Sequence, residues 1–288
     1  MGPDDARNAR PDQVDFLLEP ALLVALAAAL VLGLAWRSRP PRLRLGLRSF
    51  PAPWRAGCAA ALLIGLLATT TVEPLLGLAT GGAPLDLDVS YVRLFRAHAM
   101  LAAFLLAWWA LSGFPSPTSF LSLPRERLGG RLMLGVGAGL GAWLLTIGSM
   151  GMIGLGILWL AGGLAATAEE AAAIAPDGAG VMPEAVAYLV GLSVPRRLLL
   201  VASAGVFEEA FFRSFLQPRA GLLLSSVLFT ASHAGYGSPM LMIGVFVLST
   251  LLGRLFRSGR DVLPCMVAHS VFDAVQLLVV LPLLAASV

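Results

Sequence analysis

The stretch LMLGVGAGLGAWLLTIGSMGMIGLGILWLAGG, residues 132–163, contains no acidic, basic or histidine side chain. A helix needs about 20 apolar residues to cross roughly 30 Å of hydrocarbon, so this stretch is long enough to span a membrane. Comparable windows recur along the chain, and we predict about eight membrane-spanning helices. Their expected positions are residues 16–36, 57–79, 97–115, 132–163, 197–217, 219–236, 239–256 and 262–285.

The composition agrees with a membrane protein. Hydrophobic residues make up 58% of the chain and charged residues only 13%, whereas soluble domains carry about 25% charged residues. The mean hydropathy is +0.83. No long stretch alternates with a period of two, and an open sheet in lipid would leave backbone groups without hydrogen bonds. We therefore predict an all-α fold, a polytopic transmembrane helical bundle.

The chain divides into three parts. Residues 1–15 form a polar N-terminal tail without the basic region and cleavage site of a signal peptide, so we expect the first span to be retained. Residues 16–190 contain transmembrane helices for which we expect a structural role, with small residues that allow helices to pack closely. Residues 195–285 form a C-terminal part that carries most of the reactive groups. The glycines expected to pack are Gly135, Gly137, Gly139, Gly141, Gly148, Gly151 and Gly154.

Arginine in the loops indicates an orientation. The loop after the first expected span holds six arginines between residues 37 and 55 and no acid, which places it on the cytoplasmic side. Arg196 and Arg197 lie on the opposite side in this topology. For this reason the preceding segment, residues 183–194, is expected to be re-entrant or an interfacial helix.

Several function classes are excluded or disfavoured. The net charge is +3, but the arginines lie at span ends, where they face lipid headgroups, so nucleic acid is not an expected partner. The chain contains no lysine, which excludes a Schiff base or a Ser/Lys dyad. Glu73 and His98 lie near expected membrane edges, and we interpret both as interfacial residues.

The fifth span contains two carboxylates and a guanidinium, at Glu208, Glu209 and Arg213. Charged residues inside a span cost roughly 2.5 to 3.5 kcal/mol each unless they are paired. Glu209 lies four residues before Arg213, the favourable order for an ion pair on one helix face. Glu208 is left without a local partner, so it is our candidate general base. The alternative is a purely structural triad of the three residues.

The next motifs lie in the sixth and eighth spans. His233 follows Phe229 by one turn, and His269 precedes Asp273 by one turn. Asp273 therefore shares a helix face with His269 and can fix the imidazole tautomer or share a metal. Polar groups on three helices avoid lipid only if they face a common interior, so we expect them to converge.

These three motifs, E-E-x-x-x-R, F-x-x-x-H and H-x-x-x-D, resemble those of the CAAX protease and bacteriocin-processing family, also called CPBP or Abi. The resemblance covers about residues 195–280. It implies an intramembrane endopeptidase in which Glu208 and His233 activate a water and His269 with Asp273 stabilises the oxyanion. Glu209, Arg213 and Phe229 would support the site. Family relatives commonly carry Asn in place of Asp273.

Metal binding and two other functions are alternatives. Glu208, His233, His269 and Asp273 could together ligate zinc, but no H-E-x-x-H motif occurs, and the prediction favours a site without a tightly bound metal. The runner-up function is a transporter or channel that uses the buried Glu, His and Asp groups as a proton or ion path. A third alternative is a non-catalytic scaffold or immunity protein of the same family.

The expected location is a bacterial inner membrane, with the protein crossing the bilayer several times. The expected partners are the lipid bilayer and a protein or peptide substrate, cleaved near its C-terminus or in a transmembrane segment. The sequence does not select a substrate among membrane peptides, bacteriocins or C-terminal sorting tails.

Overall fold

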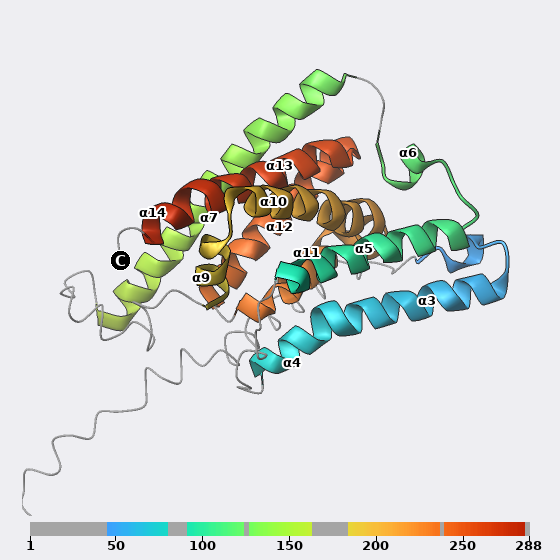
Figure 1. Cartoon of the computed structure of the whole chain (residues 1–288), viewed down its shortest axis with the longest axis horizontal. Helices are drawn as coiled ribbons and strands as arrows, with labels where there is room; N and C mark the ends of the chain where they lie inside the picture. The colour runs from blue at the N-terminus through green and yellow to red at the C-terminus, as the bar shows by residue number, and fades with distance from the viewer. Residues whose placement is uncertain (1–44, 80–90, 124–126, 163–183, 237–238, 286–288) are drawn as a thin grey trace, which may run out of the picture.

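The computed structural model describes residues 45–79, 91–123, 127–162, 184–236 and 239–285 (Figure 1). The expected N-terminal tail and first span, residues 1–15 and 16–36, lie outside these ranges. Within them the chain is helical and contains no strand. The all-α prediction is therefore confirmed for the described part of the chain.

The described residues form a series of α-helices. They are α3 (Pro53–Leu67), α4 (Glu73–Ala79), α5 (Tyr91–Leu111), α7 (Leu128–Gly162), α9 (Glu184–Gly191), α10 (Val194–Glu209), α11 (Gln217–Ser232), α12 (Pro239–Gly259), α13 (Val262–Val275) and α14 (Leu281–Ala285). Three π-helical segments continue them without a break: η2 (Ala68–Val72), η3 (Ala210–Leu216) and η5 (Gln276–Val280). The short α6 (Pro117–Phe120) lies between α5 and α7.

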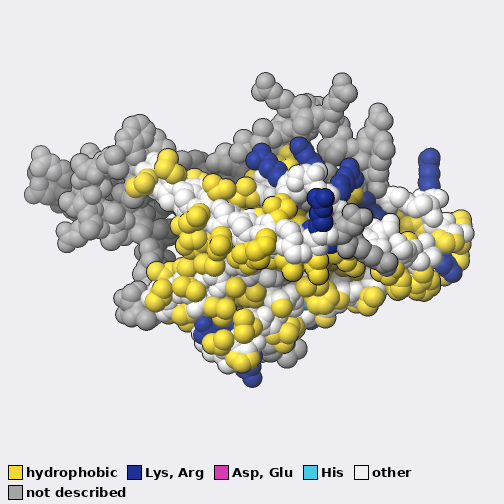
Figure 2. All heavy atoms as spheres, turned by 90° about the horizontal axis from the view of Figure 1, so that it is seen from above, with side chains coloured by type: hydrophobic (Ala, Val, Ile, Leu, Met, Phe, Trp, Pro, Cys, Tyr) yellow, Lys and Arg dark blue, Asp and Glu magenta, His cyan; other side chains and the backbone are white. Residues whose placement is uncertain are grey.

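Four described helices are long and apolar enough to cross a membrane: Pro53–Gly77, Leu128–Gly156, Leu241–Gly259 and Val262–Ala285. A shorter apolar helix covers Phe95–Leu111. Hydrophobic side chains cover a broad area of the molecular face in Figure 2, and arginines gather there in a few groups. Ile64, Leu144 and Met152 each expose about two thirds of their surface or more, at 69%, 65% and 71%. Such a surface fits an integral membrane protein, although the predicted number of eight spans is not confirmed.

The predicted fifth and sixth spans form one chain segment with a sharp turn. α10, η3 and α11 follow one another without a loop, and the backbone turns at Gly221, where φ is 84° and ψ is 167°. A side chain would be strained at this positive φ, so glycine suits the turn. The predicted boundary near residue 218 is therefore a few residues too early.

Close contact between α7 and α13 depends on two glycines one turn apart. A Cβ atom added to Gly139 would lie 2.5 Å from the carbonyl oxygen of Ala268, and one added to Gly135 would lie 2.6 Å from Cβ of Val267. The prediction of close glycine packing is thus confirmed at these two positions. At the other five, Gly137, Gly141, Gly148, Gly151 and Gly154, an added Cβ would have no atom of the described residues within 4 Å, so close packing stays a prediction there.

The segment expected to be re-entrant or interfacial forms α9. Arg197 donates hydrogen bonds to the carbonyls of Val190 and Leu192 at the end of α9, at 2.7 Å each, and to that of Leu277 at 3.0 Å. Carbonyls at a helix C-terminus lack partners within the helix. Arg197, one of the two arginines that depart from the charge pattern, therefore has a structural role.

Aromatic rings fix α5 against η3. Trp108 and Phe215 meet edge to face with ring centroids 4.7 Å apart, and Phe104 contacts Phe211 and Phe215 at 5.5 and 5.1 Å. All four rings are at most 4% exposed. Edge-to-face pairs at these distances add stability beyond the burial of area. The contacts hold α5 beside the segment that carries Glu209 and Arg213.

We expect Gly139→Ala to destabilise the protein by about 1 to 3 kcal/mol, because its methyl group must displace the backbone of α13. Gly137→Ala is the matched control, on the same helix but facing open space. Thermal unfolding in detergent measures both variants. Equal unfolding midpoints for the two would contradict the observed α7–α13 contact.

Candidate active site

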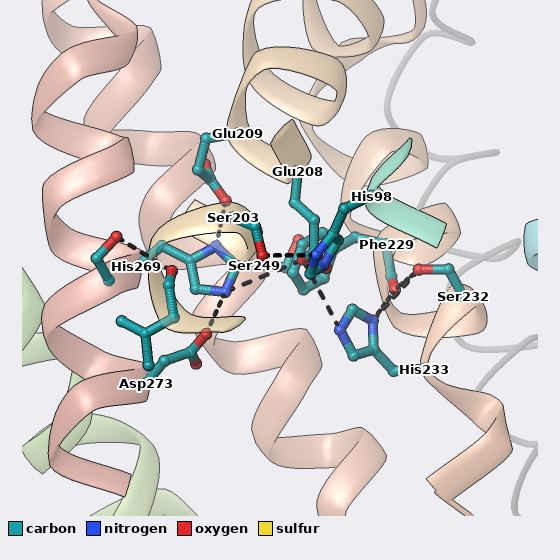
Figure 3. Close-up of polar contacts among 12 residues, drawn as sticks. His98, Ser203, Glu208, Glu209, Phe229, Ser232, His233, Ser249, His269 and Asp273 are labelled. Carbon is teal, nitrogen blue, oxygen red and sulfur yellow. Dashed lines mark hydrogen bonds and ion pairs between the residues drawn. The ribbon is translucent and has the colours of Figure 1, made fainter. Parts of the chain in front are cut away.

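Glu209 and Arg213 form an ion pair at the centre of the bundle. Nε of Arg213 donates to Oε2 of Glu209 at 2.9 Å, and both side chains are completely buried. The other carboxylate oxygen, Oε1, lies 2.9 Å from Nδ1 of His269. The ion pair predicted from the spacing is therefore present. Its Glu209 also contacts the histidine of the third motif, and Figure 3 shows Glu209 beside His269.

Arg213 extends this network to two further helices. Its Nη2 donates to Oγ of Ser249 on α12 at 3.0 Å. Its guanidinium also lies over the ring of Phe229 on α11, 5.2 Å from the ring centroid, where the negative face of the ring attracts a cation. One arginine therefore ties η3 to α11 and α12.

Glu208 points into a different group of side chains. Its Oε2 lies 3.9 Å from Nε2 of His233 and 4.0 Å from Nε2 of His269. Both distances exceed a hydrogen bond. Oε2 is buried and has no hydrogen-bond partner among the described residues. Oε2 is therefore an open acceptor that faces two imidazoles. A gap of this length between polar atoms suits a bridging water.

His233 is held in one orientation at the end of α11. Its Nδ1 donates to the carbonyl of Phe229 at 2.8 Å, and the Phe229 ring stacks on the imidazole with centroids 4.7 Å apart. Since Nδ1 donates to this carbonyl, Nε2 is the ring nitrogen that faces Glu208. Phe229 therefore walls the site and also fixes the tautomer of His233.

His269, which is on α13, lies between the carboxylates of two residues. Its Nδ1 faces Glu209, and its Nε2 lies 3.5 Å from Oδ2 of Asp273, one turn along the same helix. Gly205 on α10 permits this approach, because a Cβ there would lie 2.8 Å from the carbonyl oxygen of Met266. The close α10–α13 contact thus brings His269 to both glutamates.

The structure brings together all four predicted catalytic residues, Glu208, His233, His269 and Asp273, with their three supporting residues Glu209, Arg213 and Phe229.

One residue of the site was misinterpreted from the sequence. His98 on α5 was expected at a membrane interface, but it is only 6% exposed and its Nε2 lies 3.2 Å from Oε1 of Glu208. The sequence feature that could have indicated its role is the small number of histidines. The chain has only three, and all three lie near the Glu208 carboxylate. Glu73, expected at an interface as well, is exposed and distinct from this network.

The zinc alternative, with Glu208, His233, His269 and Asp273 as ligands, stays a prediction. No group of three or more His, Cys, Asp or Glu side chains among the described residues is arranged to hold a metal ion.

Comparisons with known proteins address the same segment. Residues 191–275 match the profile of the family described as type II CAAX prenyl endopeptidase Rce1-like. The uncharacterized protein YpbD of Bacillus subtilis (strain 168) is 36% identical over 84 residues, which are 29% of this chain and 44% of YpbD. The chain thus aligns with less than half the length of that relative. No solved structure matches. Residues 191–275, which contain every predicted site residue, therefore carry the signature of the Rce1-like CAAX endopeptidase family, and the resemblance to CAAX proteases is confirmed for this part of the chain.

Proposed function

We propose that the protein is an intramembrane endopeptidase that hydrolyses a peptide bond of a membrane protein or membrane-bound peptide. The observation that carries this proposal is the open Oε2 of Glu208, a buried acceptor about 4 Å from two imidazole nitrogens. The match to an endopeptidase family over the same residues supports it.

In this mechanism a water lies between Oε2 of Glu208 and Nε2 of His233. Glu208 accepts a proton from the water while the water oxygen attacks the scissile carbonyl carbon. The proton then passes to the leaving amine as the C–N bond breaks. The lone pair of His233 orients the water, because its Nδ1–H is engaged by the carbonyl of Phe229. A general base contributes roughly 100- to 10,000-fold to such a step.

His269 stabilises the oxyanion that the attack creates. Glu209 and Asp273 lie on opposite sides of its ring and favour an imidazolium with protons on both nitrogens. Nε2–H then donates to the carbonyl oxygen in the transition state, where a preorganised donor has its largest effect. Asp273 orients the ring through a long contact of 3.5 Å with Nε2. In the transition state, the hydrogen on Nε2 turns from Asp273 to the substrate oxygen.

The substrate class follows from the position of the site among apolar helices. A protein or peptide must approach through the bilayer or from its surface, so we propose a substrate with its cleavage site near a C-terminus or in a membrane segment. We further propose that the membrane is a bacterial inner membrane.

Glu208→Gln is expected to abolish cleavage, because the amide cannot accept the proton of water. Mass spectrometry of membrane-protein termini compares cells that express wild type and variant at equal levels. New termini that depend on Glu208 identify the substrate, and the rate should fall by roughly 100-fold or more.

Glu73→Gln is the control, since Glu73 is exposed on α4. Identical sets of termini for wild type and Glu208→Gln, with both proteins folded, would contradict catalysis by Glu208. This result would favour the transporter alternative.

Glu209→Gln is expected to reduce stability, because it leaves the buried guanidinium of Arg213 without a counter-ion. Removing one partner of a buried ion pair costs about 3 to 5 kcal/mol. Glu208→Gln provides a matched control one residue away, with a smaller expected loss. Thermal unfolding in detergent separates the two, and equal midpoints would show that the Glu209 pair does not support the fold.

No step of the proposed mechanism uses a metal. We expect purified protein treated with 1,10-phenanthroline and dialysed to retain its cleavage rate, and mass spectrometry to find much less than one zinc per chain. Loss of activity that added zinc restores would instead assign a metal to Glu208, His233, His269 and Asp273.

A further inference from the structure

His98 reaches the site from α5, a helix outside the segment that matches the endopeptidase family. Its two ring nitrogens have different partners. Nδ1 lies 2.9 Å from Oγ of Ser203 on α10, and Nε2 lies 3.2 Å from Oε1 of Glu208. Figure 3 shows the imidazole of His98 next to the Glu208 carboxylate. The side chain thus contacts two residues of α10.

The direction of these hydrogen bonds follows from Ser203. Its hydroxyl donates to the backbone carbonyl of Leu200 at 3.0 Å. A hydroxyl has one proton, so toward His98 the oxygen of Ser203 can only accept. Nδ1 of His98 therefore carries a hydrogen. Nε2 in turn faces a carboxylate oxygen, and two acceptors cannot form a hydrogen bond. One of these two atoms, Nε2 of His98 or Oε1 of Glu208, must therefore carry a hydrogen.

We propose that His98 is a positioning residue of the active site, which donates from Nε2 to Oε1 of Glu208 and so leaves Oε2 as the oxygen that meets water. This inference rests on the endopeptidase function proposed above. The contact holds the carboxylate in one rotation, with Oε2 toward His233 and His269. A hydrogen bond from Nε2–H also offsets part of the cost of burying the charge of Glu208.

The surroundings of His98 make this contact rigid. The ring is 6% exposed, and Phe95 meets its edge with centroids 6.1 Å apart. Further along α5, Trp108 is anchored against Phe215. A rigid donor is what positions a reacting group, since small displacements of such groups cost large factors in rate.

Two amide substitutions separate the two contacts of His98. Gln can place its amide nitrogen near the position of Nε2, so His98→Gln keeps a donor for Glu208 and loses the Ser203 bond. Asn reaches only to the position of Nδ1, so His98→Asn keeps the Ser203 bond and loses the donor for Glu208. Both variants are neutral and polar, which makes them a matched pair. The assay uses a fluorogenic peptide that covers the cleavage site found by the termini comparison.

We expect His98→Asn to lower kcat by roughly 10- to 100-fold with KM unchanged, which is the effect of losing a hydrogen bond to a charged group. His98→Gln should retain kcat within about tenfold of wild type. Thermal unfolding midpoints report whether either variant is misfolded. Ser203→Ala is the second test of the same contact, with a smaller loss of kcat, because the imidazole keeps its donor and loses only its anchor.

Three outcomes would overturn the role of His98. Full activity of His98→Asn would show that donation to Glu208 is not needed. Equal losses in both amide variants at unchanged midpoints would show that an N–H donor is not sufficient. A larger loss in His98→Gln would make the Ser203 contact the important one. In all three cases Glu208→Gln stays inactive. Cleavage by Glu208→Gln would instead contradict the general-base role of Glu208, on which this inference rests, and absence of cleavage by wild type would contradict the endopeptidase function itself.

Discussion

The ion pair between Glu209 and Arg213 constrains the rest of the site, because neither charge has access to water. Removing a charged group from water costs several kcal/mol even after relaxation, and the attraction of one partner rarely compensates for this alone. Both residues therefore need further polar contacts, which Ser249 and His269 supply from α12 and α13. The helices that carry these two side chains cannot move away without leaving a buried charge incompletely paired.

This pairing determines what the neighbouring carboxylate can do. Successive residues on a helix point about 100° apart, so Glu208 cannot reach the same partners as Glu209. It faces the three histidines, one each from α5, α11 and α13. Structural and reactive roles are thus divided between two adjacent carboxylates. His269 belongs to both groups, because its ring links the bracing pair to the open oxygen of Glu208.

Small residues allow these helices to approach closely enough. Gly135 and Gly139 let α7 lie against α13, and Gly205 lets α10 approach α13 one turn before the two glutamates. Helices in a bilayer gain little from burying apolar surface, so close van der Waals contact and polar bonds between helices hold the bundle together. The same contacts that stabilise the bundle therefore set the distance between His269 and the carboxylates.

The sequence by itself determined the helical fold class, the Glu209–Arg213 pair and the three motifs, because apolar length, spacing of three or four residues and the cost of charge in lipid are local properties. Only the tertiary structure decided that His98 joins Glu208, that two of seven glycines are close contacts and that Arg197 caps α9. Each of these depends on which helix face meets which neighbour, and a lone histidine or arginine near a span end has no periodic pattern that reveals its partner.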